Sequence, residues 1–584
     1  MRIGARARAR IFTTLAVLAM AACSAPTTTS PQAGAASAPP GARPGAQKTL
    51  TVGVTNNVDA FSLVGSGTTA GGWHSLDELH SEGLMTADRD SRQPVPRLIT
   101  QVPSLANGQL EVLPDGREKS TYTLRRDVTW QDGVPFTADD MTFSYELDSN
   151  PDVPFVNRDA IIQIDSVEAP DAFTFVIYWK APYYQADSIG LRGLWPQPRH
   201  LLEGPLQSLD RQGFINLPYW TAQYVHLGPY RLTDFQPAVS LTFSAYDGYF
   251  LGHPKLAQVI VREYNDENTL YAATLAGSID MLMDNSLGPD RGLKLKDEWD
   301  RSGQGTVYVG TGTTRFLAPQ FDPQVQTQPA ILNPQVRQAL VYAIDRGALS
   351  AAVQDGHAEL IANSILAPDE RLYDSVKDGW AMYTFDPGRA QAMLRQLGWT
   401  PGADGVLVGP DGGHFTTALW TTEGSENEIA AIADYWKQIG VAADQYVFSG
   451  AIVRDRAARS KYPGFETSAR GGGDSVLARV DGRNTATAAN AYSGANRGQY
   501  ASPQLDALID RYVRSVSLQD QGTAIKAVSD FMVADLPVAL LYFNPANPAV
   551  RKGVQALDDF RGGAEASQLY GTFSRNAYMW DIAE

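Results

Sequence analysis

The sequence predicts an α/β protein with several lobes. Its 584 residues allow three or four lobes of about 150 residues each. Hydrophobic residues make up 43% of the chain and aromatic residues 10%, which is enough for a substantial core. Segments with strand periodicity and segments with helix periodicity follow one another without strict βαβ repetition, and no internal repeat is visible. We therefore expect α/β lobes joined by crossovers.

Five segments have the apolar pattern of β-strands. Leu256–Val261 is a nearly continuous apolar run, which suits a strand buried on both faces. In the other four segments the side chains alternate, as in a strand with one buried face. These alternating segments are Leu50–Val54, Tyr122–Leu124, Phe173–Trp179 and Val239–Phe243.

Capping signals mark the starts of the predicted helices. Two pairs have the spacing of a capping box, namely Thr137 with Asp140 and Ser425 with Glu428. Two further helices begin with a capping side chain before proline, at Asp386-Pro387 and at Ser502-Pro503. Apolar residues also predict helices over Trp73–Leu84 and around Val336–Ala343.

The N-terminus has the plan of an export signal. Four arginines precede the apolar run Ile11–Met20, and Ala21-Ala22 then lead to Cys23, the only cysteine. The run is too short for a transmembrane helix, which needs about 20 residues. A cysteine after small residues resembles the lipobox of bacterial lipoproteins, which implies that Cys23 carries a lipid and becomes the new N-terminus. The alternative is a plain secretory signal with an incidental cysteine.

Charge and composition restrict the function of the chain after the signal. Removal of residues 1–22, which hold four arginines and no acids, changes the net charge from −16 to −20. Such a chain is a poor partner for nucleic acid and for anionic lipid. Residues 24–47 contain no large apolar side chain, so we expect a flexible tether there.

The segment Tyr122–Phe143 (YTLRRDVTWQDGVPFTADDMTF) predicts a strand, an Asp132-Gly133 turn and a helix. It closely resembles the signature of family 5 extracytoplasmic solute-binding proteins. In that family Leu-Arg leads to Trp-x-Asp-Gly-x-Pro-Phe-Thr-Ala-x-Asp, and here the motif runs from Trp130 to Asp140. Six further segments resemble elements of the family in the expected order: Pro198–Leu201, Gly228–Tyr230, Leu275–Asp280, Asn333–Arg346, Asp386–Trp399 and Asn496–Leu508.

The resemblance implies a lipid-tethered, monomeric receptor on the outer face of the cytoplasmic membrane, which delivers a solute to the permease of an ABC transporter. It also implies an α/β fold of the periplasmic-binding-protein class II type, with three lobes, two of which close over a cleft through paired hinge strands. The expected divisions are a signal peptide (1–22), a lipid-anchored tether (23–47), lobe I (48–84, 199–310 and 543–584), lobe II (85–198) and lobe III (311–542).

The ligand is not fixed by the family. Many members bind peptides, and others bind nickel chelates, haem, opines, glutathione or oligosaccharides. A peptide is the leading expectation and an oligosaccharide the main alternative. A sensor or chaperone that kept the fold without a transporter is a third possibility.

Motifs of catalysis are missing from the sequence. It has no Gly-x-Ser-x-Gly elbow, no His-Glu-x-x-His, no phosphate-binding loop and no Cys-x-x-Cys. We therefore expect no catalytic residue and no cofactor, and a lipid-anchored hydrolase is a distant alternative. His74, Glu78 and His80 allow a metal site in principle. Their spacing matches no standard zinc pattern, which favours a solvated or hydrogen-bonded helix face.

Two residues of the signature have ordinary structural explanations. Trp130 is expected to pack beneath the turn rather than to contact a ligand. Asp132 is expected to form the turn rather than to act as an acid.

Ligand contacts are expected from loops at strand ends and near hinges. Four segments qualify: Asn56–Trp73, Thr313–Phe321, Trp420–Glu423 and Glu466–Asp474. The individual candidates are Trp73, Phe316, Trp420, Glu423, Arg470, Asp474 and Tyr492. For the aromatic candidates Trp420 and Tyr492, stacking on a ligand competes with core packing.

The segment Glu466–Asp474 departs from the family pattern. Peptide-binding relatives often carry Gly-Trp here and an aspartate that pairs with the peptide's α-ammonium group. In this chain Arg470 and three glycines stand in place of the tryptophan. Asp474 remains a candidate for the ammonium partner, and Arg470 is suited to an anionic group through bidentate contacts. An ordinary surface ion pair is the alternative for both.

Overall fold

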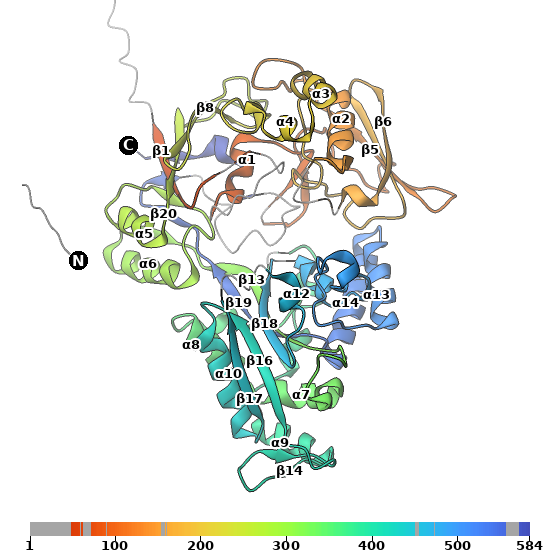
Figure 1. Ribbon diagram of the computed structural model, residues 1–584. Helices are drawn as coiled ribbons and strands as arrows, with labels where there is room; N and C mark the ends of the chain where they lie inside the picture. Colours follow the sequence, from red (N-terminus) through yellow and green to blue (C-terminus); the bar gives the residue numbers. More distant parts are fainter. Residues whose placement is uncertain are drawn as a thin grey trace, which may run out of the picture. The chain divides into compact units, whose positions relative to one another are not determined.

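Three β-sheets organise the chain in the computed structural model (Figure 1). The structure describes residues 48–58, 60–61, 72–88, 90–153, 158, 160–368, 370–449, 455–471, 473–555 and 572–583. Cys23, the export signal, the tether and most of the glycine-rich segment before Trp73 lie outside these residues. Their predicted roles are therefore not tested by the fold.

The seven-stranded sheet has the order β12-β20-β11-β1-β10-β9-β8. Strand β1 lies in its interior, parallel to β10 on one side and to β11 on the other. Helix α5 (Glu267–Leu275) contacts β1 and β10, and helix α6 (Pro289–Ser302) contacts β12. The strands are β1 (Thr49–Thr55), β8 (Tyr230–Gln236), β9 (Ser240–Ala245), β10 (Gln258–Tyr264), β11 (Met281–Leu282), β12 (Gly305–Val307) and β20 (Ala549–Arg551).

The four-stranded sheet is antiparallel, with the order β4-β5-β7-β6. Helix α2 (Ala138–Ser149) contacts β6 and β7. Trp130 is fully buried beside this sheet, and the Val134 N–H donates to Asp132 Oδ1 at 3.2 Å, so both structural predictions for the signature are confirmed. The strands are β4 (Leu110–Val112), β5 (Glu118–Thr123), β6 (Ile164–Asp171) and β7 (Thr174–Trp179).

The five-stranded sheet has the order β17-β16-β18-β13-β19. Helix α10 (Glu426–Gln438) contacts β16 and β17, whereas α13 (Pro503–Val513) and α14 (Leu518–Asp535) contact each other (Figure 1). The strands are β13 (Gly310–Pro319), β16 (Thr416–Thr422), β17 (Ala442–Phe448), β18 (Phe465–Arg470) and β19 (Ala539–Ala546).

Short elements complete the described chain. Three two-stranded ladders pair β2 (Met85–Ala87) with β3 (Pro94–Pro96), β14 (Thr400–Pro401) with β15 (Leu407–Val408), and β21 (Val554–Gln555) with β22 (Asp581–Ile582). The remaining α-helices are α1 (Asp77–His80), α3 (Arg199–Ser208), α4 (Arg211–Ile215), α7 (Pro334–Tyr342), α8 (Arg346–Val353), α9 (Pro387–Gln396) and α12 (Arg456–Arg459). No helix in the described ranges is long and apolar enough to cross a membrane.

The chain passes between the seven-stranded and the five-stranded sheet through two neighbouring connections. One joins β12 to β13 at residues 308–309, and the other joins β19 to β20 at residues 547–548. The Tyr308 N–H donates to the Pro548 carbonyl at 2.9 Å, so the two connections are hydrogen-bonded to each other. Each connection is only two residues long, so only a few backbone dihedral angles separate one sheet from the other.

A second set of contacts joins the segment after β7 to segments of the chain that lie between strands of the five-stranded sheet in sequence. Arg371 forms a bidentate ion pair with Asp187, at 2.8 and 3.1 Å. The Tyr184 N–H donates to the Val513 carbonyl at 2.9 Å, and Gln521 Nε2 donates to the Tyr184 carbonyl at 2.9 Å. These contacts are far apart in sequence and are independent of the two connections.

Most of the strand and helix predictions are confirmed. The five predicted strand segments overlap β1, β5, β7, β9 and β10. Thr137 and Asp140 form the predicted capping box, and Asp386 and Ser502 accept hydrogen bonds at the starts of α9 and α13.

Two local predictions are wrong. The helix expected over Trp73–Leu84 is only a 3-10 turn followed by α1, because the chain becomes extended at Ser81. Ser425 makes no side-chain cap, and Glu428 does not reach back to it. Glu428 is instead buried in an ion pair with Arg315, a partner 113 residues away in sequence. A buried charge pair outweighs a cap that can be replaced by water.

We predict that Gly228→Ala will strongly destabilise the protein. A Cβ atom at this position would lie 2.3 Å from the His80 carbonyl carbon and 2.5 Å from the Ser81 nitrogen, both backbone atoms. Such overpacking lowers the free energy of unfolding by about 2 kcal/mol or more. Urea denaturation followed by tryptophan fluorescence measures it.

The matched control is Gly388→Ala, an exposed position in the first turn of α9, where an added Cβ atom lies 3.5 Å from Asp386 Oδ1, an ordinary contact. This change should raise the free energy of unfolding by about 0.5–1 kcal/mol, because alanine is the better helix former. Equal effects of the two substitutions would contradict the close approach of residue 228 to residues 80–81.

Candidate functional site

Strand β18 carries the residues around which the candidate site is built. Side chains alternate along a strand, so Glu466, Ser468 and Arg470 share one face of the five-stranded sheet. Phe316 of β13 is the antiparallel partner of Ser468 and therefore lies on the same face. Trp420 of β16 is in register with Glu466 and shares this face as well.

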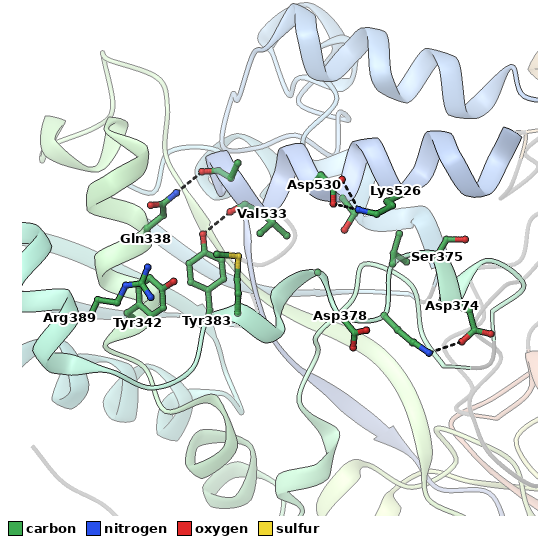
Figure 2. Close-up of a pocket in the computed structure, with 16 residues that line it drawn as sticks. Gln338, Tyr342, Asp374, Ser375, Asp378, Tyr383, Arg389, Lys526, Asp530 and Val533 are labelled. Atoms are coloured by element: carbon green, nitrogen blue, oxygen red, sulfur yellow. Dashed lines mark hydrogen bonds and ion pairs between the residues drawn. The ribbon is translucent and has the colours of Figure 1, made fainter. Parts of the chain in front are cut away.

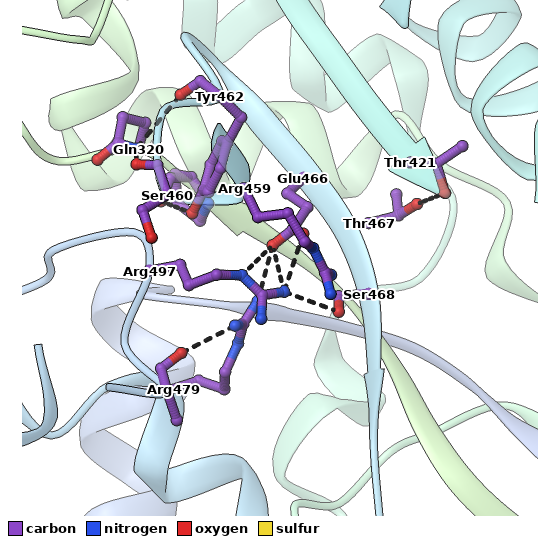
Figure 3. A network of polar contacts seen from close by, with 12 residues as sticks. Gln320, Thr421, Arg459, Ser460, Tyr462, Glu466, Thr467, Ser468, Arg479 and Arg497 are labelled. Atoms are coloured by element: carbon purple, nitrogen blue, oxygen red, sulfur yellow. Dashed lines mark hydrogen bonds and ion pairs between the residues drawn. The ribbon is translucent and has the colours of Figure 1, made fainter. Parts of the chain in front are cut away.

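The Glu466 carboxylate is fully buried and binds three arginines (Figure 3). Its Oε1 accepts from Arg459 at 3.0 Å and from Arg497 at 2.8 Å, and its Oε2 accepts from Arg479 at 2.9 Å. Arg459 ends α12, Arg479 ends the 3-10 segment Gly473–Arg479, and Arg497 precedes α13. One carboxylate thus fixes three separate segments against β18.

Burial and charge within this cluster lower the pKa values of both Glu466 and Arg479. Burial alone would raise the pKa of Glu466, but Arg497, Arg479 and Arg459 outweigh it and lower the pKa from 4.5 to about 2. Burial, with repulsion from Arg497, lowers the pKa of Arg479 to about 10. Arg479 also lies 5.1 Å above the Phe316 ring, in cation–π geometry. Glu466 and Arg479 are therefore both charged at neutral pH.

A cavity of about 560 Å³ opens beside this cluster. Five of the described residues that line it are arginines, and none is acidic. The lining residues are Arg456, Arg459, Ser468, Ala469, Arg470, Arg479, Tyr492, Ser493, Gly494, Ala495 and Arg497. We call this cavity the arginine pocket.

The arginine pocket lies at the end of the sheet where the two connections enter. Arg470 at the end of β18 is paired with Thr314, near the start of β13, because the two strands are antiparallel. The connection from the seven-stranded sheet precedes Gly310, only four residues before Thr314. A ligand in the pocket would therefore lie close to the passage between the two sheets.

Two of the predicted ligand contacts, Arg470 and Tyr492, meet in the arginine pocket, although 22 positions separate them in the sequence. Asp474 is half-buried at the start of the 3-10 segment and is not among the lining residues. Glu423 is exposed just after β16.

The predicted aromatic contacts lie outside the pocket. Trp73 is buried and stacks on His80, with ring centroids 5.4 Å apart. Phe316 is buried beneath Arg479. Trp420 is half-buried and packs against Tyr446 of β17, with ring centroids 4.6 Å apart.

Sequence reasoning missed four of the five arginines, namely Arg456, Arg459, Arg479 and Arg497. A signal was present, because residues 454–497 carry seven arginines and one lysine against four acids in a chain of net charge −16. Arg456 and Arg459 are also three residues apart, which places them on one face of a helical turn. The role of Glu466 as their common partner had no local signal.

A second cavity of about 700 Å³ lies between α7, α14 and the 3-10 turns at Tyr373–Ser375 and Gly379–Met382 (Figure 2). Four of its charged residues form two ion pairs, Lys526 with Asp530 at 2.7 Å and Lys377 with Asp374 at 3.5 Å. None of the predicted site residues lines it. The arginine pocket is thus the better candidate.

The histidines of the predicted helix face do not form a metal centre with their neighbours. Among the residues that the structure describes, no group of three or more His, Cys, Asp or Glu side chains could hold a metal ion. His80 is buried, its Nδ1 lies 2.8 Å from Ser81 Oγ, and burial lowers its pKa to about 4. The hydrogen-bonded alternative therefore describes His80.

Comparison with known proteins decides the family. The profile of the bacterial extracellular solute-binding proteins, family 5 Middle, matches residues 100–475, well over half of the chain. The chain belongs to this family. Family 5 consists of solute-binding proteins that do not catalyse reactions, which agrees with the missing catalytic motifs.

The chain is also similar to curated binding proteins of ABC transporters, at low identity. A Brucella ovis protein named as an ABC transporter peptide-binding protein is 27% identical over 290 residues, 50% of this chain and 50% of that protein. The chain thus spans about half the length of this curated relative.

Two solved structures cover nearly the whole chain. The oligopeptide-binding protein from Thermus thermophilus, complexed with a pentapeptide, is 23% identical, with a TM-score of 0.65 over 91% of this chain and 96% of that one. NikA from Brucella suis, in complex with Fe(III)-EDTA, is 19% identical, with a TM-score of 0.69 over 91% and 99%. These likenesses confirm the predicted class II periplasmic-binding-protein fold.

We predict that Glu466→Gln will destabilise the folded state by about 3 kcal/mol, because it leaves three buried or half-buried guanidinium groups without their carboxylate. The effect should depend on pH. The folded-state pKa of Glu466 is about 2 and its ordinary value is 4.5, so its contribution is full above pH 4.5 and disappears as the pH falls toward 2. Urea denaturation between pH 2 and 7 measures both effects.

The control is Glu146→Gln, an exposed residue on α2. The wild type and the control should lose stability between pH 4.5 and 2, whereas the Glu466 variant should lose less over that interval. The cluster would have no stabilising role if the Glu466 variant unfolded at the same urea concentration as the wild type at pH 7.

Proposed function

We propose that this protein is the solute receptor of an ABC importer, which captures its ligand in the arginine pocket and delivers it to the membrane permease. The observation that carries the proposal is the position of this pocket, beside the passage between two sheets of a family 5 fold. All described lining residues come from the segment 456–497, so the ligand would be held on the side of the passage that carries the five-stranded sheet.

The proposed cycle is closure of lobes around the ligand. We assign the seven-stranded sheet to lobe I (48–84, 199–310 and 543–584), the four-stranded sheet to lobe II (85–198) and the five-stranded sheet to lobe III (311–542). The two short connections then serve as the hinge. Contacts such as Arg371–Asp187 form between lobes and stabilise the closed state. A ligand shifts the population toward closure only if it binds the closed state more tightly.

A peptide is the ligand class that we propose. The Brucella ovis relative is named for peptide binding, and the Thermus thermophilus structure holds a pentapeptide. Arg470 and Tyr492 are the contacts that we assign from the sequence candidates, because both line the pocket.

We further propose that the monomeric receptor is held at the outer face of the cytoplasmic membrane by a lipid on Cys23. The tether of residues 24–47 would keep the receptor near its permease at a high effective concentration. This arrangement rests on the sequence of the N-terminus alone.

Native mass spectrometry of the protein purified from its own host tests the receptor function. We expect the purified protein to carry a bound solute, and partial denaturation should release it and leave a protein with the mass of the unliganded chain. A series of bound peptides of different mass would support a peptide as the ligand. Deletion of the gene should abolish uptake of that solute. A protein that carries no solute, and whose deletion changes no uptake, would not be an import receptor.

We predict that Cys23→Ser will move the protein from the membrane fraction to the soluble fraction, because the thiol is the only possible site for the thioether-linked lipid. Ser24→Ala is the matched control and should remain with the membrane. Fractionation followed by immunoblotting measures the distribution, and full membrane retention of the Cys23 variant would refute the lipid anchor.

A further inference from the structure

The arginine pocket selects for negative charge. We propose that the solute is anionic and carries at least two carboxylates, which are bound by the guanidinium groups of the arginine pocket. This inference rests on the proposed receptor function and adds the chemical class of the ligand. An acidic peptide and a small polycarboxylate both present this chemistry.

The charge of the pocket supports the proposal. Its lining holds five arginines and no described acidic residue. Glu466 lies behind the lining and Asp474 lies close by in the sequence. Even if both acids are assigned to the pocket, three positive charges remain uncompensated. Two carboxylates on the solute reduce this excess from three positive charges to one. A neutral solute leaves the excess unchanged, and a cationic solute increases it.

The hydrogen bonds within the cluster leave donors for a ligand. Both oxygens of Glu466 already accept from more than one guanidinium nitrogen, so this carboxylate cannot satisfy further donors. The buried Nε–H of Arg459 makes no hydrogen bond to any described residue. The Arg456 guanidinium is exposed, and no ion pair to a described residue forms at it.

The geometry of the donors fits carboxylates. A guanidinium presents a planar pair of N–H groups that matches the two oxygens of a carboxylate. The arginines come from α12, β18, the 3-10 segment and the loop before α13, so they surround the cavity from several sides. At about 560 Å³ the cavity admits a small solute or the acidic part of a peptide.

The positive charge of the arginine pocket contrasts with the net negative charge of the protein. The whole chain has a net charge of −16 and repels anions at long range. A local positive site in an acidic protein therefore has to bind its anion through short contacts. Screening by salt weakens long-range repulsion as well as attraction, so moderate salt should reduce affinity less than it does for a basic protein.

The test is isothermal titration calorimetry of the full chain, freed of co-purified ligand by partial unfolding and refolding. Four probes separate the possibilities: citrate, triglutamate, trialanine and trilysine. We expect citrate or triglutamate to bind at least tenfold more tightly than trialanine, and trilysine not to bind. Preference for citrate identifies a small polycarboxylate as the source, and preference for triglutamate identifies an acidic peptide.

Single substitutions test the assignment to this pocket. Arg456→Gln and Arg470→Gln should each weaken binding of the better anionic probe at least tenfold, because each removes a charged donor. Arg395→Gln, which changes an exposed arginine of α9 outside the pocket, is the matched control and should bind as the wild type does. Far-ultraviolet circular dichroism checks that each variant is folded.

Three results would overturn the proposal. They are equal or tighter binding of trialanine or trilysine, failure of both anionic probes to bind, and unchanged affinity in both pocket variants. In each of these cases a co-purified neutral or cationic solute, with loss of its uptake on deletion, would still support the receptor function. The failure of the charge assignment is therefore distinguishable from the failure of the function.

Discussion

The buried carboxylate of Glu466 is the interaction on which the candidate site depends. Arg459, Arg479 and Arg497 belong to segments that have no regular sheet or long helix of their own to hold them. Their common partner on β18, the central strand, fixes all three segments against one face of the five-stranded sheet. The walls of the arginine pocket are consequently positioned by electrostatics, while the sheet beneath them is positioned by apolar packing.

The route of the chain explains why a site at this position can respond to a ligand. The two connections between the sheets are adjacent, short and hydrogen-bonded to each other, so rotation about them changes few backbone dihedrals. The Arg371–Asp187 pair and the Tyr184–Val513 hydrogen bond lie elsewhere, and Tyr184 and Val513 also pack against two of the hydrophobic clusters. In the proposed cycle the charged groups of Arg371 and Asp187 would regain hydrogen bonds with water when the lobes open.

The sequence predicted the regular framework better than the site. Alternation in Phe173–Trp179 and the Thr137 capping box depend on neighbouring residues, and both were predicted correctly. The Ser425 box failed because Glu428 has a partner 113 residues away, a contact that local spacing cannot reveal. Arg470 could be selected as a candidate because it lies in a family segment, and Tyr492 because its ring could stack on a ligand. The grouping of Arg459, Arg479 and Arg497 could not, since it depends on convergence at Glu466 in the folded chain.

The composition of the cluster argues that stability alone did not shape it. Several half-buried arginines around one carboxylate repel each other, and a second buried acid would satisfy their donors better. The described lining of the pocket contains no such acid, although the chain as a whole has more acidic than basic residues. Positive charge that remains unbalanced in a cavity lowers the stability of the folded protein. A bound ligand with negative charge offsets this loss, as in other functional sites. The excess of arginine is therefore better explained by the solute than by the fold.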